Sequence, residues 1–226
     1  MNSNSYQKLI TQMISITVVG CFFSFSVYAE NEDINEQKAE SNVEALKQTK
    51  VNVDDKSFSC IRDMTPVRHF YVDNMLGDID STLAAANAPE GAKYPTGSVV
   101  QLVPTEVMVK REPGTSLATG DWEFFELEVN DNGSKIAKRG FVDVVNRFDG
   151  NCFSCHAPAR EPWDFICESG HGCEPIPIDH KMTGALQRSD PRCGEAVPED
   201  GDWMALAKLK TMVSIGLAKK WVEGLF

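Results

Sequence analysis

Residues 152–156 read Cys-Phe-Ser-Cys-His, so two thiols stand three positions apart and an imidazole directly follows the second thiol. This spacing is typical of covalent haem attachment, in which the two thiols add to the two vinyl groups of a porphyrin and the histidine ligates the iron. The motif predicts that Cys152 and Cys155 hold one haem c and that His156 is its proximal ligand. A covalent haem would form part of the hydrophobic core and so constrain the whole fold.

Two other interpretations of these residues stay open. A zinc site needs four ligands, usually from two Cys-x-x-Cys pairs, of which the chain has one; Cys167, His171 and Cys173 could form such a site by themselves or complete one with Cys152 and Cys155. A redox-active dithiol is expected at a helix start within a parallel βαβ unit, and no parallel-sheet pattern precedes Asn151. The dithiol interpretation also leaves His156 unexplained.

The N-terminus is typical of an export signal over residues 1–29. Lys8 supplies the positive start, an apolar stretch follows, and small Ala29 stands just before acidic Glu30. We expect cleavage after Ala29 and a periplasmic protein, in agreement with haem c, which is attached outside the cytoplasmic membrane. The alternative is a lipid anchor at Cys21, because Val-Val-Gly-Cys resembles a bacterial lipidation site. Only in that case do we expect a membrane association.

Four cysteines remain once the signal and the haem motif are set aside. An oxidising compartment favours disulfides, and four cysteines allow three pairings. We expect Cys167 with Cys173, which closes a local loop, and Cys60 with Cys193, which ties the two ends of the domain together.

The mature chain divides into a leader and one domain. Residues 30–56 have no aromatic side chain and few large apolar ones, which predicts a flexible acidic and polar leader. The domain then covers 57–226, with a Cys-rich loop over 161–201 and an amphipathic helix over 202–226. One face of that helix is expected to carry Trp203, Leu206, Leu209, Val213 and Leu217.

Hydrophobic periodicity predicts two helices in the first part of the domain. Thr65 as N-cap, Pro66 at the first helical position and apolar residues at helical spacing predict a helix over 65–77. A second, short helix is expected over 80–88, before Pro89.

The period then changes to that of β-strands. Phe125, Leu127 and Val129 alternate with Glu126 and Glu128, which predicts a strand in an antiparallel sheet with one wet face. The fold class is therefore α+β: a small antiparallel β-sheet flanked by helices, with the covalent haem c packed against it. The β-rich runs cover 97–103, 105–111, 121–129 and 135–148.

Three segments in fixed order resemble the cytochrome P-460 family and its relative cytochrome c′-beta. They are Tyr-Pro-Thr-Gly-Ser-Val-Val, Asp-Trp-Glu-Phe-Phe-Glu-Leu-Glu and the haem motif, within roughly residues 65–166. The resemblance implies a small exported mono-haem protein with a mostly antiparallel sheet, and the same roles for Cys152, Cys155 and His156. It also implies that aromatic side chains wall the haem, drawn from Trp122, Phe124, Phe125 and Phe141.

Members of this family that oxidise hydroxylamine carry a strand lysine cross-linked to the haem. An ungapped count from Gly97 places Leu102 at that position, and the nearest lysines are Lys93 and Lys110. The departure argues against a cross-link here, and so against the chemistry that depends on it.

We therefore expect an exported mono-haem cytochrome that transfers single electrons or binds a small ligand of the nitric oxide type. The alternatives are an oxidoreductase acting on hydroxylamine or another small nitrogen compound, and a haem-free zinc or disulfide-rich binding module. The partner would be a redox protein or a small diatomic or nitrogen ligand. Nucleic acid is not expected, since the formal charge is −11. Enzymatic activity and oligomeric state, a homodimer included, are left open.

Further candidates for the haem surroundings follow from residue type alone. Methionine or histidine at the sixth position of the iron would give a six-coordinate electron carrier, and an acid near the haem would assist proton transfer. The candidates are Met64, Met75, Met108, Met182, His69, His171 and His180 as ligands, and Glu106 and Glu126 as acids. As strand residues, these two acids are otherwise expected to be solvated.

Overall fold

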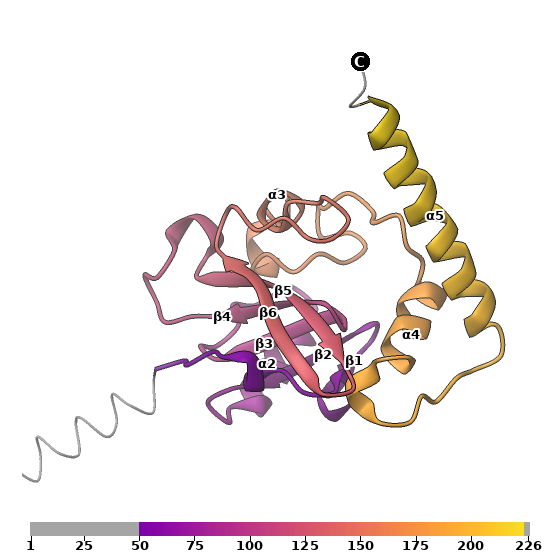
Figure 1. Cartoon of the computed structure of the whole chain (residues 1–226). Coiled ribbons are helices and arrows are strands. Elements are labelled where there is room, and N and C mark those ends of the chain that lie inside the picture. Colours follow the sequence, from indigo (N-terminus) through magenta and orange to yellow (C-terminus); the bar gives the residue numbers. More distant parts are fainter. Residues whose placement is uncertain (1–49, 224–226) are drawn as a thin grey trace, which may run out of the picture. The chain divides into compact units, whose positions relative to one another are not determined.

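A computed structural model describes residues 50–223. The predicted signal peptide, its cleavage site, Cys21 and most of the leader lie outside these residues. Within them, six strands form one antiparallel sheet in the order of the chain, so each strand pairs with the next along the sequence (Figure 1). The strands are β1 Thr65–Val67, β2 Phe70–Asn74, β3 Ser98–Val103, β4 Glu106–Lys110, β5 Trp122–Asn130 and β6 Gly133–Gly140.

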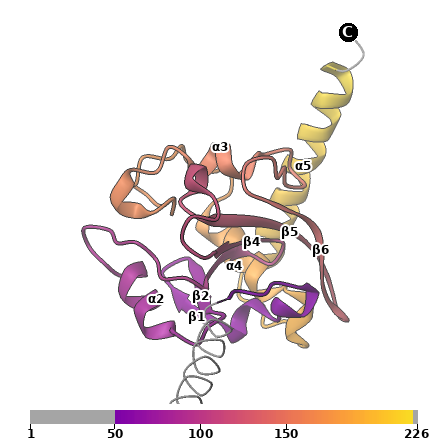
Figure 2. The ribbon, with the colours of Figure 1, turned by 90° about the vertical axis from the view of Figure 1, so that its left-hand side faces the viewer.

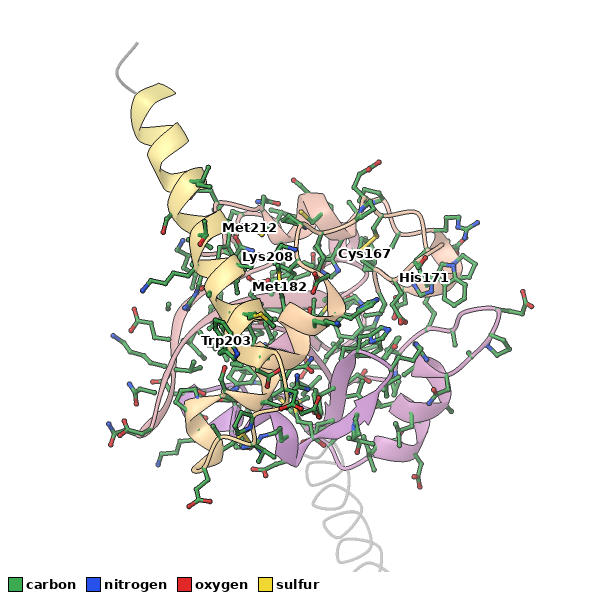
Figure 3. The ribbon with its side chains drawn as sticks, turned by 90° about the vertical axis from the view of Figure 1, so that its right-hand side faces the viewer. Cys167, His171, Met182, Trp203, Lys208 and Met212 are labelled. Carbon is green, nitrogen blue, oxygen red and sulfur yellow. A yellow bond between two sulfur atoms is a disulfide. The ribbon has the colours of Figure 1, made fainter. Side chains whose placement is uncertain are left out.

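Four helices accompany the sheet in the described part of the chain, which confirms the α+β class. They are α2 Ile79–Ala86, α3 Cys152–His156, α4 His180–Arg188 and α5 Asp202–Glu223. Helix α2 confirms the short helix expected over 80–88, and the Asp78 side chain caps it by accepting from the Ser81 N–H. Helix α4 packs beside α5 (Figures 1 and 3).

The helix predicted over 65–77 is wrong, because this segment forms the hairpin β1–β2. Val67 and Phe70 pair across the hairpin on either side of a two-residue turn, in which Arg68 has a φ of 50°. The turn leaves these two apolar residues three positions apart, which imitates the spacing of one helix face. Pro66 is tolerated because β1 is the edge strand of the sheet.

Both faces of the central strands β3, β4 and β5 are buried, which corrects the expectation of one wet face, whereas β6 has only half-buried and exposed residues. The α3-side core includes Val100, Met108, Trp122 and Phe124. The opposite core contains Val99, Val107, Val109, Phe125 and Leu127. The predicted alternation of β5 is thus confirmed, but apolar groups cover both of its sides. Helix α3 and the loop that follows it lie over one side of the sheet (Figure 2).

The folded part begins before residue 57, where the domain was expected to begin. Val51 is 1% exposed and packs in the opposite core together with Phe58. Arg111 Nη2 donates to the Val51 carbonyl at 2.8 Å, and Arg139 Nη1 donates to the Val53 carbonyl at 3.0 Å. Two valines and these backbone contacts are enough to attach the segment to the sheet.

Both expected disulfides are confirmed. Cys60 is bonded to Cys193, with Cα atoms 4.6 Å apart, and Cys167 to Cys173, with Cα atoms 5.6 Å apart. Two disulfides indicate an oxidising environment, in agreement with export.

Helix α5 begins at Asp202, where the closing helix was expected to begin. Leu209 is buried and Leu206 and Val213 are half-buried, as the periodicity predicts. Trp203 is 73% exposed, so its assignment to the buried face is wrong (Figure 3). Among residues 50–223, no helix has the length and hydropathy that crossing a membrane requires.

Candidate functional site

Helix α3 carries the Cys-x-x-Cys-His motif on little more than one turn, held at its N-terminus. Asn151 caps it, since its side-chain oxygen accepts from the Ser154 N–H at 2.8 Å and its Nδ2 donates to the Val142 carbonyl at 2.9 Å. The Cys152 N–H donates to the Val144 carbonyl at 2.9 Å. These bonds fix the start of the motif against the segment that follows β6.

Cys152 and Cys155 are the free thiols of the described residues, because the other four cysteines are bonded in pairs. Cys152 is half-buried beside the α3-side core, and Cys155 is exposed. The zinc interpretation needed Cys167 and Cys173, whose sulfurs are bonded to each other. Its remaining donor, His171, stacks on Trp163.

His156 has its Nδ1 2.7 Å from the carbonyl oxygen of Phe165. A carbonyl can only accept, so Nδ1 carries the hydrogen and the lone pair of Nε2 is free. This is the tautomer that a metal-ligating histidine adopts when its second nitrogen is held by an acceptor. Burial lowers the pKa of His156, which also favours the neutral imidazole that a metal requires. The ring lies 5.3 Å from the ring of Phe124.

The surroundings of Cys152 favour an uncharged sulfur. Burial raises the pKa of this thiol to about 12, and the negative charges of Glu106 and Glu126 add to the effect. Reactive dithiols show the opposite shift, because their chemistry needs a thiolate. The shift therefore argues against a redox dithiol, whereas the neutral sulfur of a thioether fits this position.

Glu106 and Glu126 are direct neighbours across β4 and β5, on the face that Cys152 borders. Arg147 Nε donates to Glu126 Oε1 at 2.6 Å, and Asn146 Nδ2 donates to Glu106 Oε1 at 3.0 Å. Burial, followed by the charge of Glu126, raises the pKa of Glu106 to about 7. The second oxygen of Glu126 is buried without a hydrogen-bond partner.

These acids are not the solvated strand residues that the sequence suggested. Glu126 is only 4% exposed. Together with Glu106, whose pKa is raised to about 7, it forms a pair of carboxyl groups beside Cys152.

The aromatic residues expected around a haem divide between the two faces of the sheet. Trp122 and Phe124 belong to the α3-side core, but Phe125 lies in the opposite core and cannot share a wall with them. Phe141 is half-buried after the end of β6. Only Trp122 and Phe124 of this set therefore stay candidates for contact with a group attached at α3.

Two aromatic residues near the motif were not selected from the sequence. Phe153 and Phe165 pack against the α3-side core, with ring centroids 6.3 Å apart. Phe153 stands inside the motif, so its place on α3 was available as a signal. Phe165 gave no signal, because only the folding of the loop after α3 brings it to His156.

Lys93 and Lys110, the lysines nearest to the counted cross-link position, both contact Asp164. Leu102, at the counted position, packs against the α3-side core. Lys110 is buried, and its Nζ lies 2.7 Å from an oxygen of Asp164. Lys93 is largely exposed, with its Nζ 3.7 Å from the other oxygen of Asp164. The ammonium of Lys110 is therefore committed to a carboxylate.

Of the four candidate methionines, Met108 lies in the core that Cys152 borders. His171 donates from Nδ1 to the Ile166 carbonyl at 2.7 Å, in the same loop as Phe165. The other candidates lie elsewhere: Met64 and Met75 against the opposite core, Met182 buried within α4, and His69 and His180 stacked on each other with ring centroids 3.5 Å apart.

The site can thus be interpreted only from its own residues and their geometry. Residues 50–223 contain no group of three or more His, Cys, Asp or Glu side chains arranged to hold a metal ion by themselves. No family model, no curated protein and no solved structure matches the chain.

Proposed function

We propose that this chain is an exported c-type mono-haem cytochrome that transfers single electrons or binds a small ligand of the nitric oxide type. Cys152 and Cys155 would hold the haem by thioether bonds, and His156 would ligate its iron. The observation that carries the proposal is His156 itself. It directly follows a pair of free thiols, and its Nδ1–H donates to a backbone carbonyl, which leaves Nε2 available.

A bound haem c would supply an iron that changes oxidation state or takes a ligand. The chain's own residues supply the surroundings. Phe124, Phe153 and Phe165 offer apolar contact near the motif, which lowers the local dielectric. Glu106 and Glu126 place an ionisable group beside Cys152. Together with the two disulfides, these features support an exported redox protein, whose partner would be a second redox protein or a small ligand.

The enzyme alternative rests on one observation, the acid pair. A carboxyl with a pKa of about 7, as at Glu106, is suited to accept a proton from a small nitrogen substrate. Leu102 at the cross-link position and the pairing of Lys110 with Asp164 argue against the lysine-linked haem of hydroxylamine-oxidising enzymes. A haem-free disulfide-rich module stays the alternative of a different class.

The first test is the mass and spectrum of the full chain, exported from a host that attaches haem c. We expect the mass of the mature polypeptide plus one haem, and a reduced pyridine haemochrome typical of two thioether bonds. Cys155→Ala should shift the haemochrome toward that of a single thioether. Ser154→Ala is the matched control on the same helix and should behave like the wild type. A mass equal to the polypeptide alone would contradict the proposal and favour the haem-free module.

The second test addresses the iron. His156→Ala should keep the porphyrin attached but change the visible spectrum, since the thioether bonds do not need the imidazole. An unchanged spectrum would show that His156 is not the ligand. Spectra with and without nitric oxide then separate a six-coordinate carrier, which responds little, from an open site, which responds strongly.

A further inference from the structure

The orientation of His156 depends on a single acceptor, the carbonyl of Phe165, at 2.7 Å from Nδ1. Nothing in α3 itself supplies that acceptor, because Phe165 lies nine positions further along the chain. Whatever fixes the peptide of Phe165 therefore also fixes the imidazole.

Asp164, which directly precedes Phe165, is held by hydrogen bonds to both its side chain and its backbone carbonyl. Its side chain is fully buried, and both carboxylate oxygens accept from Lys110 Nζ, at 2.8 and 2.7 Å. One of these oxygens also accepts from the Tyr94 N–H at 2.8 Å. The Asp164 carbonyl accepts from Trp122 Nε1 at 2.7 Å. Strands β4 and β5 thereby hold this residue through one side chain each.

The backbone here needs such an anchor. Asp164 and Phe165 have φ values of 48° and 67°, and two successive residues of this type in the left-handed region are rare. Aspartate tolerates this region better than most residues, but phenylalanine does not. Gly120 gives the Phe165 ring its room, because a Cβ at Gly120 would lie 2.9 Å from the ring. The conformation thus persists because the surroundings impose it.

We propose that Asp164, anchored by Lys110, is the positioning residue of the proximal histidine: it fixes the Phe165 carbonyl and thereby the direction and strength of the hydrogen bond at His156 Nδ1. For its effect on the iron this inference rests on the proposed function. A strong Nδ1–H bond makes the imidazole a more basic ligand, which stabilises ferric iron. The buried pair would therefore adjust the midpoint potential through the hydrogen bond of His156.

The test compares Asp164→Asn with a matched control, Asp190→Asn. Asp190 is also fully buried, pairs with Arg192 at 2.7 Å, and accepts from the buried Ile61 N–H at 2.9 Å. Both substitutions keep the side-chain shape and leave a buried cation without its counter-charge, so both should lower stability. Of these two residues, only Asp164 directly precedes Phe165, whose carbonyl accepts the hydrogen bond from His156 Nδ1.

The haem-loaded full chain gives the first readout. Loss of the anchor should weaken the Nδ1–H bond, so Asp164→Asn should raise the midpoint potential, whereas Asp190→Asn should leave it at the wild-type value. Lys110→Met should shift the potential in the same direction as Asp164→Asn. The inference would be overturned if Asp164→Asn and Lys110→Met both kept the midpoint potential of the wild type. It would also be overturned if Asp190→Asn shifted the potential as much as Asp164→Asn.

The second readout does not need haem. In the ¹⁵N-labelled full chain from a host without haem attachment, His156 should be the Nδ1–H tautomer in the wild type and in Asp190→Asn. In Asp164→Asn the two tautomers should mix. A wild type without the Nδ1–H tautomer, or an Asp164→Asn variant that keeps it fully, would overturn the inference. Absence of haem from the first preparation, by contrast, would contradict only the proposed function.

Discussion

At Glu106, the folded structure holds a proton that the unfolded chain releases at lower pH. Burial and the neighbouring Glu126 raise the pKa of this carboxyl from 4.5 to about 7. Between these two values the folded state binds more protons than the unfolded state, so stability falls as the pH rises through this window. The pair thus costs stability above neutral pH, which is typical of residues kept for function rather than for folding.

Replacing Glu106 by Gln should remove this dependence on pH. At pH 8 the variant should gain up to about 3 kcal/mol in free energy of unfolding over the wild type, because it buries no second charge. At pH 4.5 and below, the free energies of unfolding of the two proteins should differ little, because the Glu106 carboxyl of the folded wild type is then protonated. Urea unfolding at both pH values gives the measurement.

Glu128→Gln is the control for this prediction, since Glu128 is exposed on β5, the strand that pairs with β4. Because it keeps Glu106, it should show the same fall in stability between the two pH values as the wild type. A constant offset between Glu106→Gln and the wild type at all pH values would contradict the assigned pKa.

Single residues were predictable where their chemistry is local. Cys152, Cys155 and His156 could be selected because the spacing of three neighbouring side chains defines the motif. The burial of Glu126 could not be predicted in this way, because the side chain that contacts it, Arg147, comes from the segment before α3. Asp164 gave no signal either, since its role depends on partners far away in the sequence.

At the scale of elements, periodicity predicted the sheet well and failed at its first hairpin. The strands β3 to β5 and α2 follow from alternation and turn residues, which act within a few positions, whereas the run expected over 135–148 forms one strand that ends at Gly140. The segment 65–74 satisfied the helix pattern only because a two-residue turn separates paired apolar residues by three positions. The burial of both sheet faces also needed information from distant segments, among them Val51.

An ion pair between Arg188 of α4 and Asp202 holds the start of α5. Arg188 Nε and Nη2 donate to the two oxygens of Asp202 at 2.8 and 2.6 Å, and the pKa of Asp202 falls to about 2, mainly because of this bond. Asp202→Asn should therefore weaken the docking of α5 by about 1 kcal/mol, a modest value because the pair borders solvent. Hydrogen exchange of the α5 amides should become faster, and that of β5 should not change.

The control is Glu199→Gln, because Glu199 contacts the same arginine at 3.3 Å but its side chain is 69% exposed. It should leave the exchange of α5 unchanged. Equal effects of the two substitutions would show that general charge, rather than the Asp202 contact, holds the helix. At acid pH the wild type should come to resemble Asp202→Asn, since the contribution of Asp202 is lost as the pH falls toward 2.

At the scale of the whole molecule, the two disulfides constrain chain segments of very different length. Cys60–Cys193 joins residues 133 positions apart, next to further contacts between the same segments. The Asp190 carboxylate accepts from the Ile61 N–H, and Arg62 donates to the Glu195 carbonyl. Cys167–Cys173 closes a span of six positions in the loop after α3. Compartment and an even cysteine count predicted two disulfides, but not which of the three pairings forms or which contacts surround them.

Removing the long-range disulfide should therefore cost more stability than removing the local one. In the chain-entropy description, a cross-link over 133 positions contributes about 5 kcal/mol and one over six positions about 2 kcal/mol. The double variant Cys60→Ala/Cys193→Ala should lose correspondingly more free energy of unfolding than Cys167→Ala/Cys173→Ala in denaturant titrations of the exported chain. The buried position of Cys60, 6% exposed, adds a packing loss in the same direction. Equal losses would mean that the unfolded chain already keeps its two ends together, so that the bond between them constrains little.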